Sequence, residues 1–213
     1  MEEDLAVRRP PLSQVDIFRV DDHFKSIILD LRFCCRLMDN VYDGVETGAT
    51  DHHDGLLAYY RDVIQHRLLS LPPGRHDMEI ARLATLAFTY GVTHPMPRPE
   101  PLLRAIKRLA CALQTTMYTA GQSAEFLFWA AMVGAVALDP RPDQESMARI
   151  FSGYICTFAN ELNLSSWESA ILLLKKFVWL GRACDEGARS VWNGSLQATS
   201  LADWPTLCTV QDT

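Results

Sequence analysis

The segment Phe126-Leu-Phe-Trp-Ala-Ala-Met-Val-Gly-Ala-Val-Ala-Leu138 contains thirteen residues and not one charge. A membrane-spanning helix needs about 18 or more apolar residues, so this segment is too short to cross a bilayer. An apolar helix of this length is instead typical of the centre of a helical protein, where other helices surround it. The sequence therefore predicts a buried core helix from Phe126 to Leu138, in which Gly134 permits close helix packing.

Apolar residues recur at helical spacing on both sides of this segment, which predicts further helices. Aspartates can cap several of them, and Ser165 with Glu168 has the spacing of a capping box. The predicted helices run from Asp21 or Asp22 through Met38, from Asp54 through Leu68, from about Asp77 to Tyr90, from Leu102 through Met117, from Met147 through Phe158, from Leu164 through Leu180, and from Ala188 to Trp192. Connections are expected at Asp39 to His53, Leu71-Pro-Pro-Gly74, Pro95 to Pro101 and Asp139-Pro-Arg-Pro142.

No stretch alternates like a strand over a useful length, and no internal repeat occurs. The predicted fold class is therefore all-α, an array of about eight helices. A chain of 213 residues is expected to form a single domain. We place this helical domain at residues 21–192, between an N-terminal tail at 1–20 and an irregular tail at 193–213.

Composition limits the classes of function. The chain is 48% hydrophobic and 22% charged, as in ordinary soluble proteins, and its net charge is −6. A negative chain is repelled by phosphate backbones, which weighs against direct nucleic-acid binding by this polypeptide alone. The start Met1-Glu-Glu-Asp4 is unlike a secretory signal, which leaves cytosol or nucleus as the expected compartment.

Six cysteines are scattered along the chain, and none forms a Cys-x-x-Cys unit. A zinc knuckle or a redox motif is therefore not supported. We expect buried thiols in a reducing compartment. The cysteines are Cys34, Cys35, Cys111, Cys156, Cys184 and Cys208.

Two polar segments could suggest metal chemistry. Asp51-His-His-Asp54 has no third ligand at a helical offset, so a solvated loop that caps a helix is favoured. Asp39-Asn-Val-Tyr-Asp43 is similar to the Asp-rich motif of all-helical, magnesium-dependent isoprenoid enzymes. The second ligand set of those enzymes is approached by Asn160 to Glu168, but with spacings off by one. This enzyme stays an alternative, as does a stand-alone helical interaction protein.

Other catalytic signals are missing. The sequence has no Gly-x-Ser-x-Gly elbow, no phosphate-binding glycine-rich loop and no His-Glu-x-x-His. Arg104, Lys107 and Arg108 share one helix face opposite an apolar stripe, where a solvated face is the favoured interpretation and contact with DNA or an acidic partner the alternative. We therefore predict no catalytic residue, no metal ligand and no cofactor in this chain.

The last third of the sequence carries a resemblance. After the Trp-Ala helix at Phe126–Leu138 come Leu164-Ser-Ser-Trp-Glu168, Phe177-Val-Trp-Leu180 and Asp185-Glu-Gly-Ala-Arg-Ser-Val-Trp192. This ordered set resembles the C-terminal regulatory domain of fungal binuclear zinc-cluster transcription factors. Val178 replaces the usual Leu, and the Gly of the acidic turn is displaced by one residue.

The resemblance implies a nuclear transcriptional regulator, of which this chain supplies the helical regulatory portion and not the DNA-binding zinc cluster. DNA binding and zinc would then belong to a separate six-cysteine module of a full-length parent. Protein partners or self-association, and a small apolar effector, are implied. Five aromatic residues are expected to act as core anchors or to line an effector cavity: Trp129, Trp167, Phe177, Trp179 and Trp192.

Overall fold

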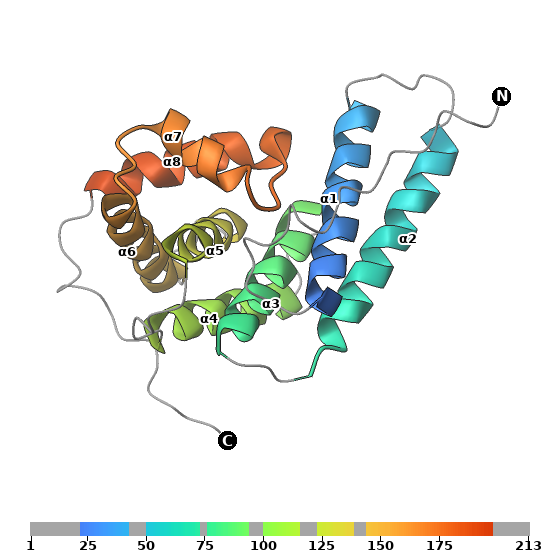
Figure 1. Cartoon of the computed structure of the whole chain (residues 1–213), viewed down its shortest axis with the longest axis horizontal. Coiled ribbons are helices and arrows are strands. Elements are labelled where there is room, and N and C mark those ends of the chain that lie inside the picture. Colours follow the sequence, from blue (N-terminus) through green and yellow to red (C-terminus); the bar gives the residue numbers. More distant parts are fainter. Residues whose placement is uncertain are drawn as a thin grey trace. The chain divides into compact units, whose positions relative to one another are not determined.

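The computed structural model describes residues 22–42, 50–72, 76–93, 100–115, 123–138 and 144–197. These residues form eight α-helices and one π-helix, and no strand occurs among them. The all-α prediction is therefore confirmed. The chain divides into two compact units, Met1–Ser70 and Leu71–Thr213, whose helices can be followed in Figure 1.

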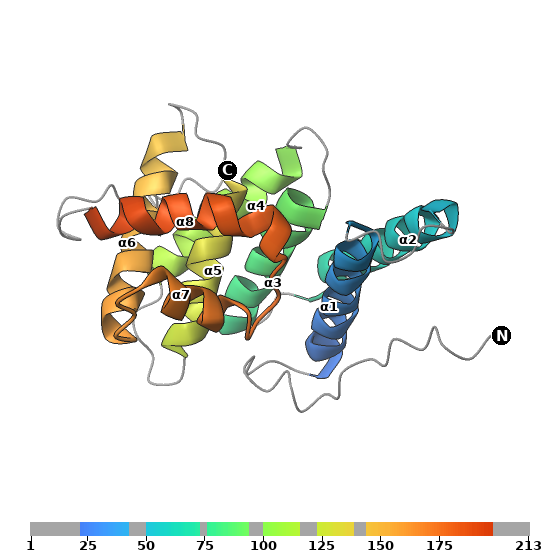
Figure 2. The ribbon, with the colours of Figure 1, turned by 90° about the horizontal axis from the view of Figure 1, so that it is seen from above.

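The first unit contains α1 (Asp22–Tyr42) and α2 (Thr50–Leu69), which lie side by side in both Figure 1 and Figure 2. Apolar residues at helical spacing on α2, including Leu57, Ile64 and Leu68, are buried. A polar link also joins the two helices, because Arg67 Nη1 on α2 donates to Asp30 Oδ2 on α1 at 2.5 Å. Arg67 also donates to the Ser26 hydroxyl, so one guanidinium holds two positions of α1.

Two sequence predictions for this unit are wrong. The connection expected at Asp39 to His53 is shorter, because α1 continues through Tyr42 and α2 already begins at Thr50. Asp51-His-His-Asp54 consequently lies within α2, and Asp54 is a helical residue instead of a cap.

The second unit contains α3 (His76–Phe88), a π-helix η2 (Thr89–Thr93), α4 (Glu100–Thr115), α5 (Ala124–Ala137), α6 (Glu145–Glu161), α7 (Trp167–Leu174) and α8 (Gly181–Gln197). Helix α5 contacts all five other α-helices of this unit, and it lies among them in Figures 1 and 2. Every residue of α5 from Phe126 to Gly134 is buried. The predicted core helix is therefore confirmed.

Gly134 brings α6 close to α5. A Cβ atom at this position would lie only 2.3 Å from Phe151 Cε1, so only a glycine leaves room for the Phe151 ring.

No helix of the described segments has the length and apolar character that a membrane crossing requires.

Three predictions about the end of the chain are wrong. The helix expected from Leu164 through Leu180 ends at Leu174, and bonds from Lys176 N to Leu173 O and from Phe177 N to Leu174 O tighten its end. Ser166, and not Ser165, caps α7, and Ser169 takes the reciprocal role expected of Glu168. The acidic turn from Asp185 is helical, because α8 begins at Gly181 and extends to Gln197.

Helix α8 thus includes the first five residues of the predicted irregular tail, 193–197. The remaining tail residues, 198–213, and the N-terminal tail lie outside the described residues. Helix α4 begins one residue before Pro101, which therefore belongs to the first helical turn and not to the predicted linker. Proline is tolerated there because its missing N–H would have no partner within the helix.

Candidate functional site

The aromatic residues singled out by sequence lie around α5 and the α7–α8 connection, residues 175–180. Trp129 on α5 and Phe177 in the connection are buried, and their rings stack with centroids 5.6 Å apart and an angle of 21°. Phe126, one helical turn before Trp129, completes the group at 6.0 Å from the Trp129 ring and 6.4 Å from the Phe177 ring. We call Phe126, Trp129 and Phe177 the Trp129 cluster.

A hydrogen bond fixes the cluster to the connection. Trp129 Nε1 donates to the carbonyl oxygen of Val178 at 2.9 Å, in a fully buried environment. An indole N–H that is buried without a partner is unfavourable, so this bond favours the turn that presents Val178 O to α5. The end of α7 at Leu174 is what allows this, since the connection can then bring Phe177 and Val178 together against one side chain.

The other three residues lie elsewhere. Trp192 on α8 is buried and packs edge-on against Phe128 of α5, with centroids 6.1 Å apart. Trp179 is partly exposed, and its Nε1 donates to Asp185 Oδ1 on α8 at 2.8 Å. Trp167 begins α7 and is partly exposed, and no ring contact joins it to the other four among the described residues. The structure therefore brings Trp129 and Phe177 together and places Trp192 on another part of α5.

Phe126, Phe128 and Asp185 were not singled out from the sequence. Phe126 could have been found, because it lies three residues before Trp129 and shares its helix face. Asp185 could not, because its role depends on the angle at which α8 follows the connection. At the surface, Lys176 Nζ also reaches Glu125 Oε1 at 2.9 Å, which links the connection to the first turn of α5.

Burial raises the pKa of two thiols among the described residues. It raises the pKa of Cys34 to about 11 and the pKa of Cys184 to about 12. Cys35 is also buried, whereas Cys111 and Cys156 are partly exposed, so the expectation of buried thiols applies to three of the five described cysteines. Cys208 lies outside the described residues.

The polar candidates for metal chemistry are not assembled in the described segments. Asp39 lies on α1, but Asp43 lies outside these segments. Among the described residues, no group of three or more His, Cys, Asp or Glu side chains could hold a metal ion. Hydrogen bonds from its own backbone amide and from Ser166 lower the pKa of Glu168, which places this carboxylate at the start of α7 as a helix-terminus residue.

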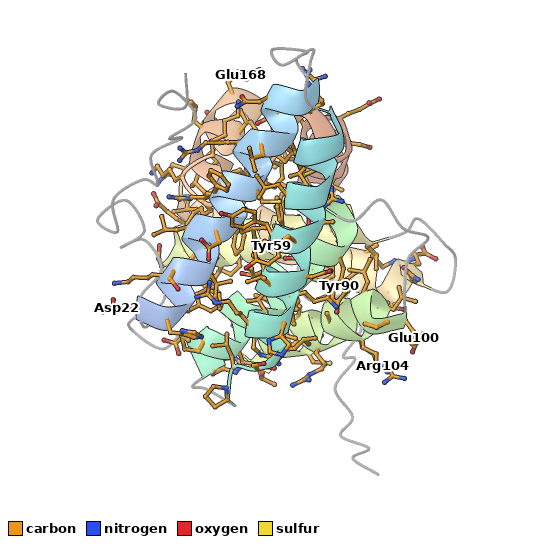
Figure 3. The ribbon with its side chains drawn as sticks, turned by 90° about the vertical axis from the view of Figure 1, so that its right-hand side faces the viewer. Asp22, Tyr59, Tyr90, Glu100, Arg104 and Glu168 are labelled. Atoms are coloured by element: carbon orange, nitrogen blue, oxygen red, sulfur yellow. The ribbon has the colours of Figure 1, made fainter. Side chains whose placement is uncertain are left out.

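The basic face of α4 is partly neutralised. Arg104 Nε lies 3.2 Å from Glu100 Oε1, and both side chains are labelled in Figure 3. Arg108 lies 2.7 Å from Glu79 of α3, and Arg82 binds the same carboxylate. This arrangement ties α4 to α3, and two of the three predicted cations have a carboxylate partner.

The Trp129 cluster can hold the α7–α8 connection on α5, but it presents no acid, base or nucleophile for a reaction. No family model, curated protein or solved structure matches the chain.

Proposed function

We propose that this chain is the helical regulatory portion of a nuclear transcriptional regulator of the fungal zinc-cluster type. It acts through protein contacts, and sequence-specific DNA binding and zinc belong to a separate module of a full-length parent. The observation that carries the proposal is the ordered resemblance from Phe126 to Trp192.

The packing supports treating those matching residues as one unit. The Trp-Ala helix and the Phe-Val-Trp segment contact each other through the Trp129 stack and the bond to Val178 O. Trp192, which ends the resembling set, packs on the same helix.

A mechanism follows from this packing. A helical pack with two arrangements can mask or expose an activation surface, and an apolar effector or a protein partner that binds one arrangement better shifts the balance. The α7–α8 connection is the element that we assign to this change, because it is irregular and its position depends on Phe177 and Val178.

A tethering experiment tests the proposal. The chain is fused to a heterologous DNA-binding domain, and expression of a reporter downstream of its site is measured in a fungal host. We expect a several-fold change relative to the DNA-binding domain alone, abolished by Trp129→Ala and retained in Glu186→Gln, an exposed position on α8. An unchanged reporter, with the fusion protein present at normal abundance, would refute the regulatory role.

A second measurement tests the zinc-cluster assignment. The complete transcript that contains this coding sequence is determined from its 5′ end. We expect an in-frame segment that encodes a basic cluster of six cysteines, either in this transcript or in an alternative one from the same locus. A reporter effect without any such segment would retain the regulatory role and remove the zinc-cluster assignment.

A further inference from the structure

We propose that the chain forms a symmetric dimer in which the exposed face of α2 pairs antiparallel with the same face of a second copy. This dimer does not depend on the transcriptional role, because it is inferred from the residues of α2 alone. The face is defined by Tyr59, Asp62, His66 and Leu69, and we call it the α2 outer face.

These four residues follow one another at intervals of three, four and three positions, which is the spacing of a coiled-coil seam. All four are exposed, with 62% of Tyr59 and 56% of Leu69 accessible to solvent. The opposite side of the helix carries the buried stripe of Leu57, Ile64 and Leu68. Helix α2 therefore has large apolar side chains on two sides, although one stripe is enough for its packing on α1.

Tyr59 has an aromatic neighbour on its own helix. Its ring lies edge-on to Tyr60 at 5.8 Å, and Tyr60 packs on Phe33 of α1 at 5.1 Å. Figure 3 labels Tyr59 on α2. Tyrosine has only two side-chain torsions to restrict on association and is enriched at the centres of interfaces, which favours Tyr59 as an interface anchor.

The order of the four residues determines the partner. In an antiparallel pair of identical helices, residue numbers that add to a constant lie opposite each other. If Asp62 lies opposite His66 of the second copy, then Tyr59 lies opposite Leu69 of that copy. In this register each Asp62 carboxylate faces a His66 imidazole, which forms two central layers of paired residues. Each Tyr59 ring faces a Leu69 side chain, which forms two outer layers. Every contact occurs twice because the dimer is symmetric.

Charge complementarity is the reason to choose a second copy over another partner. Neither Asp62 nor His66 takes part in an ion pair with any other described residue. In the dimer, two carboxylates and two imidazoles alternate at the centre, and each imidazole N–H can donate to a carboxylate. A parallel pair would instead place Asp62 opposite Asp62 and His66 opposite His66. The two carboxylates would repel each other, and no acid would face an imidazole, so the parallel pair is unfavourable.

The affinity is expected to be modest, because a single pair of helices with four layers buries little surface. Such an interface corresponds to a Kd on the order of micromolar. The experiment is sedimentation equilibrium on the full chain over about 1 to 500 μM. We expect the average mass to rise from the 24.0 kDa of one chain toward twice that value. A constant mass of one chain would overturn the proposal, whether the face stays bare or another segment of the chain covers it.

Two charge variants test the register. In Asp62→Lys the central layers of a homodimer contain only lysine and histidine, and in His66→Glu they contain only acids. Each variant alone is expected to weaken association at least tenfold. Mixed together they restore each other's contacts, because Lys at 62 of one chain meets Glu at 66 of the other and His66 meets Asp62, so a heterodimer should form with at least the affinity of the unaltered chain.

The control is Glu186→Lys, which makes the same change of charge as Asp62→Lys at an exposed position on another helix, α8. It should leave the mass distribution unchanged. Helical circular dichroism of every variant should equal that of the unaltered chain, since all substituted positions are exposed. A dimer that Asp62→Lys does not weaken, or two weakened variants whose mixture stays monomeric, would overturn the antiparallel α2 pairing.

Discussion

Helices α5 and α2 both carry large apolar side chains on more than one side, but their surroundings differ. Helix α5 is surrounded by the other helices of its unit, and its residues from Phe126 to Gly134 are buried. Helix α2 packs on α1 through one stripe and leaves Tyr59 and Leu69 exposed on the other side. Large apolar side chains on more than one side of a helix therefore have two meanings: they indicate a core helix where neighbouring helices surround it, and a candidate interface where they do not.

The largest expected effect is at the centre of the surrounded helix. Trp129→Ala removes the stack with Phe177, removes the hydrogen bond to Val178 O and leaves a cavity at a fully buried position. We expect the free energy of unfolding to fall by about 3–5 kcal/mol. Urea denaturation followed by tryptophan fluorescence and circular dichroism measures this change.

Tyr59→Ala is the matched control on α2, because it removes an exposed ring. Measured at a concentration at which the chain is monomeric, it should cost less than about 1 kcal/mol. Equal losses for the two variants would contradict the distinction between a buried and an exposed apolar face.

The polar link between α1 and α2 is expected to give the next largest effect. Asp30 has a side chain only 8% exposed, and Arg67→Met leaves its carboxylate without this cation. We expect a loss of about 2 kcal/mol in the free energy of unfolding. Lys176→Met, which breaks the more exposed pair with Glu125, should cost less than about 1 kcal/mol.

A double-mutant cycle on Asp30 and Arg67 separates their interaction from the effects of the single changes. A coupling energy near zero would show that the two side chains contribute independently. The stripe of Leu57, Ile64 and Leu68 would then account for the attachment of α2 to α1.

Substitutions at two glycines, Gly134 of α5 and Gly55 of α2, allow a direct comparison of the two helices. In Gly134→Ala the new methyl group would lie 2.3 Å from Phe151 Cε1, whereas at Gly55 of α2 a methyl group would meet no atom within 4 Å. We expect Gly134→Ala to destabilise by about 1–3 kcal/mol through overpacking. Gly55→Ala should stabilise by about 0.5–1 kcal/mol, because alanine favours the helix. Thermal unfolding shows whether each substitution raises or lowers the stability. A change in the same direction for both variants would contradict the described packing.

The last effect is that of pH on the buried thiols of both units. The pKa values of Cys34 and Cys184 are raised above that of an unfolded thiol, so their contribution to stability is complete below the unfolded pKa. It is lost as the pH rises from there toward the folded pKa, because only the unfolded chain then releases the proton. Between about pH 7 and pH 10 we expect each of the two thiols to contribute a loss of roughly 1–2 kcal/mol, which denaturant titrations at the two pH values measure.

Cys184→Ala should reduce this pH-dependent loss, whatever it does to stability at neutral pH. An unaltered pH dependence in Cys184→Ala would mean that the thiol ionises in the folded chain as it does in the unfolded one.

The sequence by itself determined the helical class, the central position of Phe126–Leu138 and the breaks between most of the helices. Those features depend on local periodicity and on residues that cannot continue a helix, so they can be read from short windows. It also indicated Trp129, Phe177 and Trp192, which are buried, since burying a large aromatic ring is favourable in almost any arrangement, whereas Trp167 and Trp179 are partly exposed.

Only the tertiary structure decided that α7 ends at Leu174, that Ser166 caps it, and that Phe177 with Val178 O meets Trp129. The indole N–H and its acceptor are 49 positions apart, and Asp30 and Arg67 are 37 apart, so no local pattern could have paired them. Helix propensity is weak compared with the burial of an aromatic ring and the satisfaction of its N–H. The long-range contact therefore determines where the local helix ends.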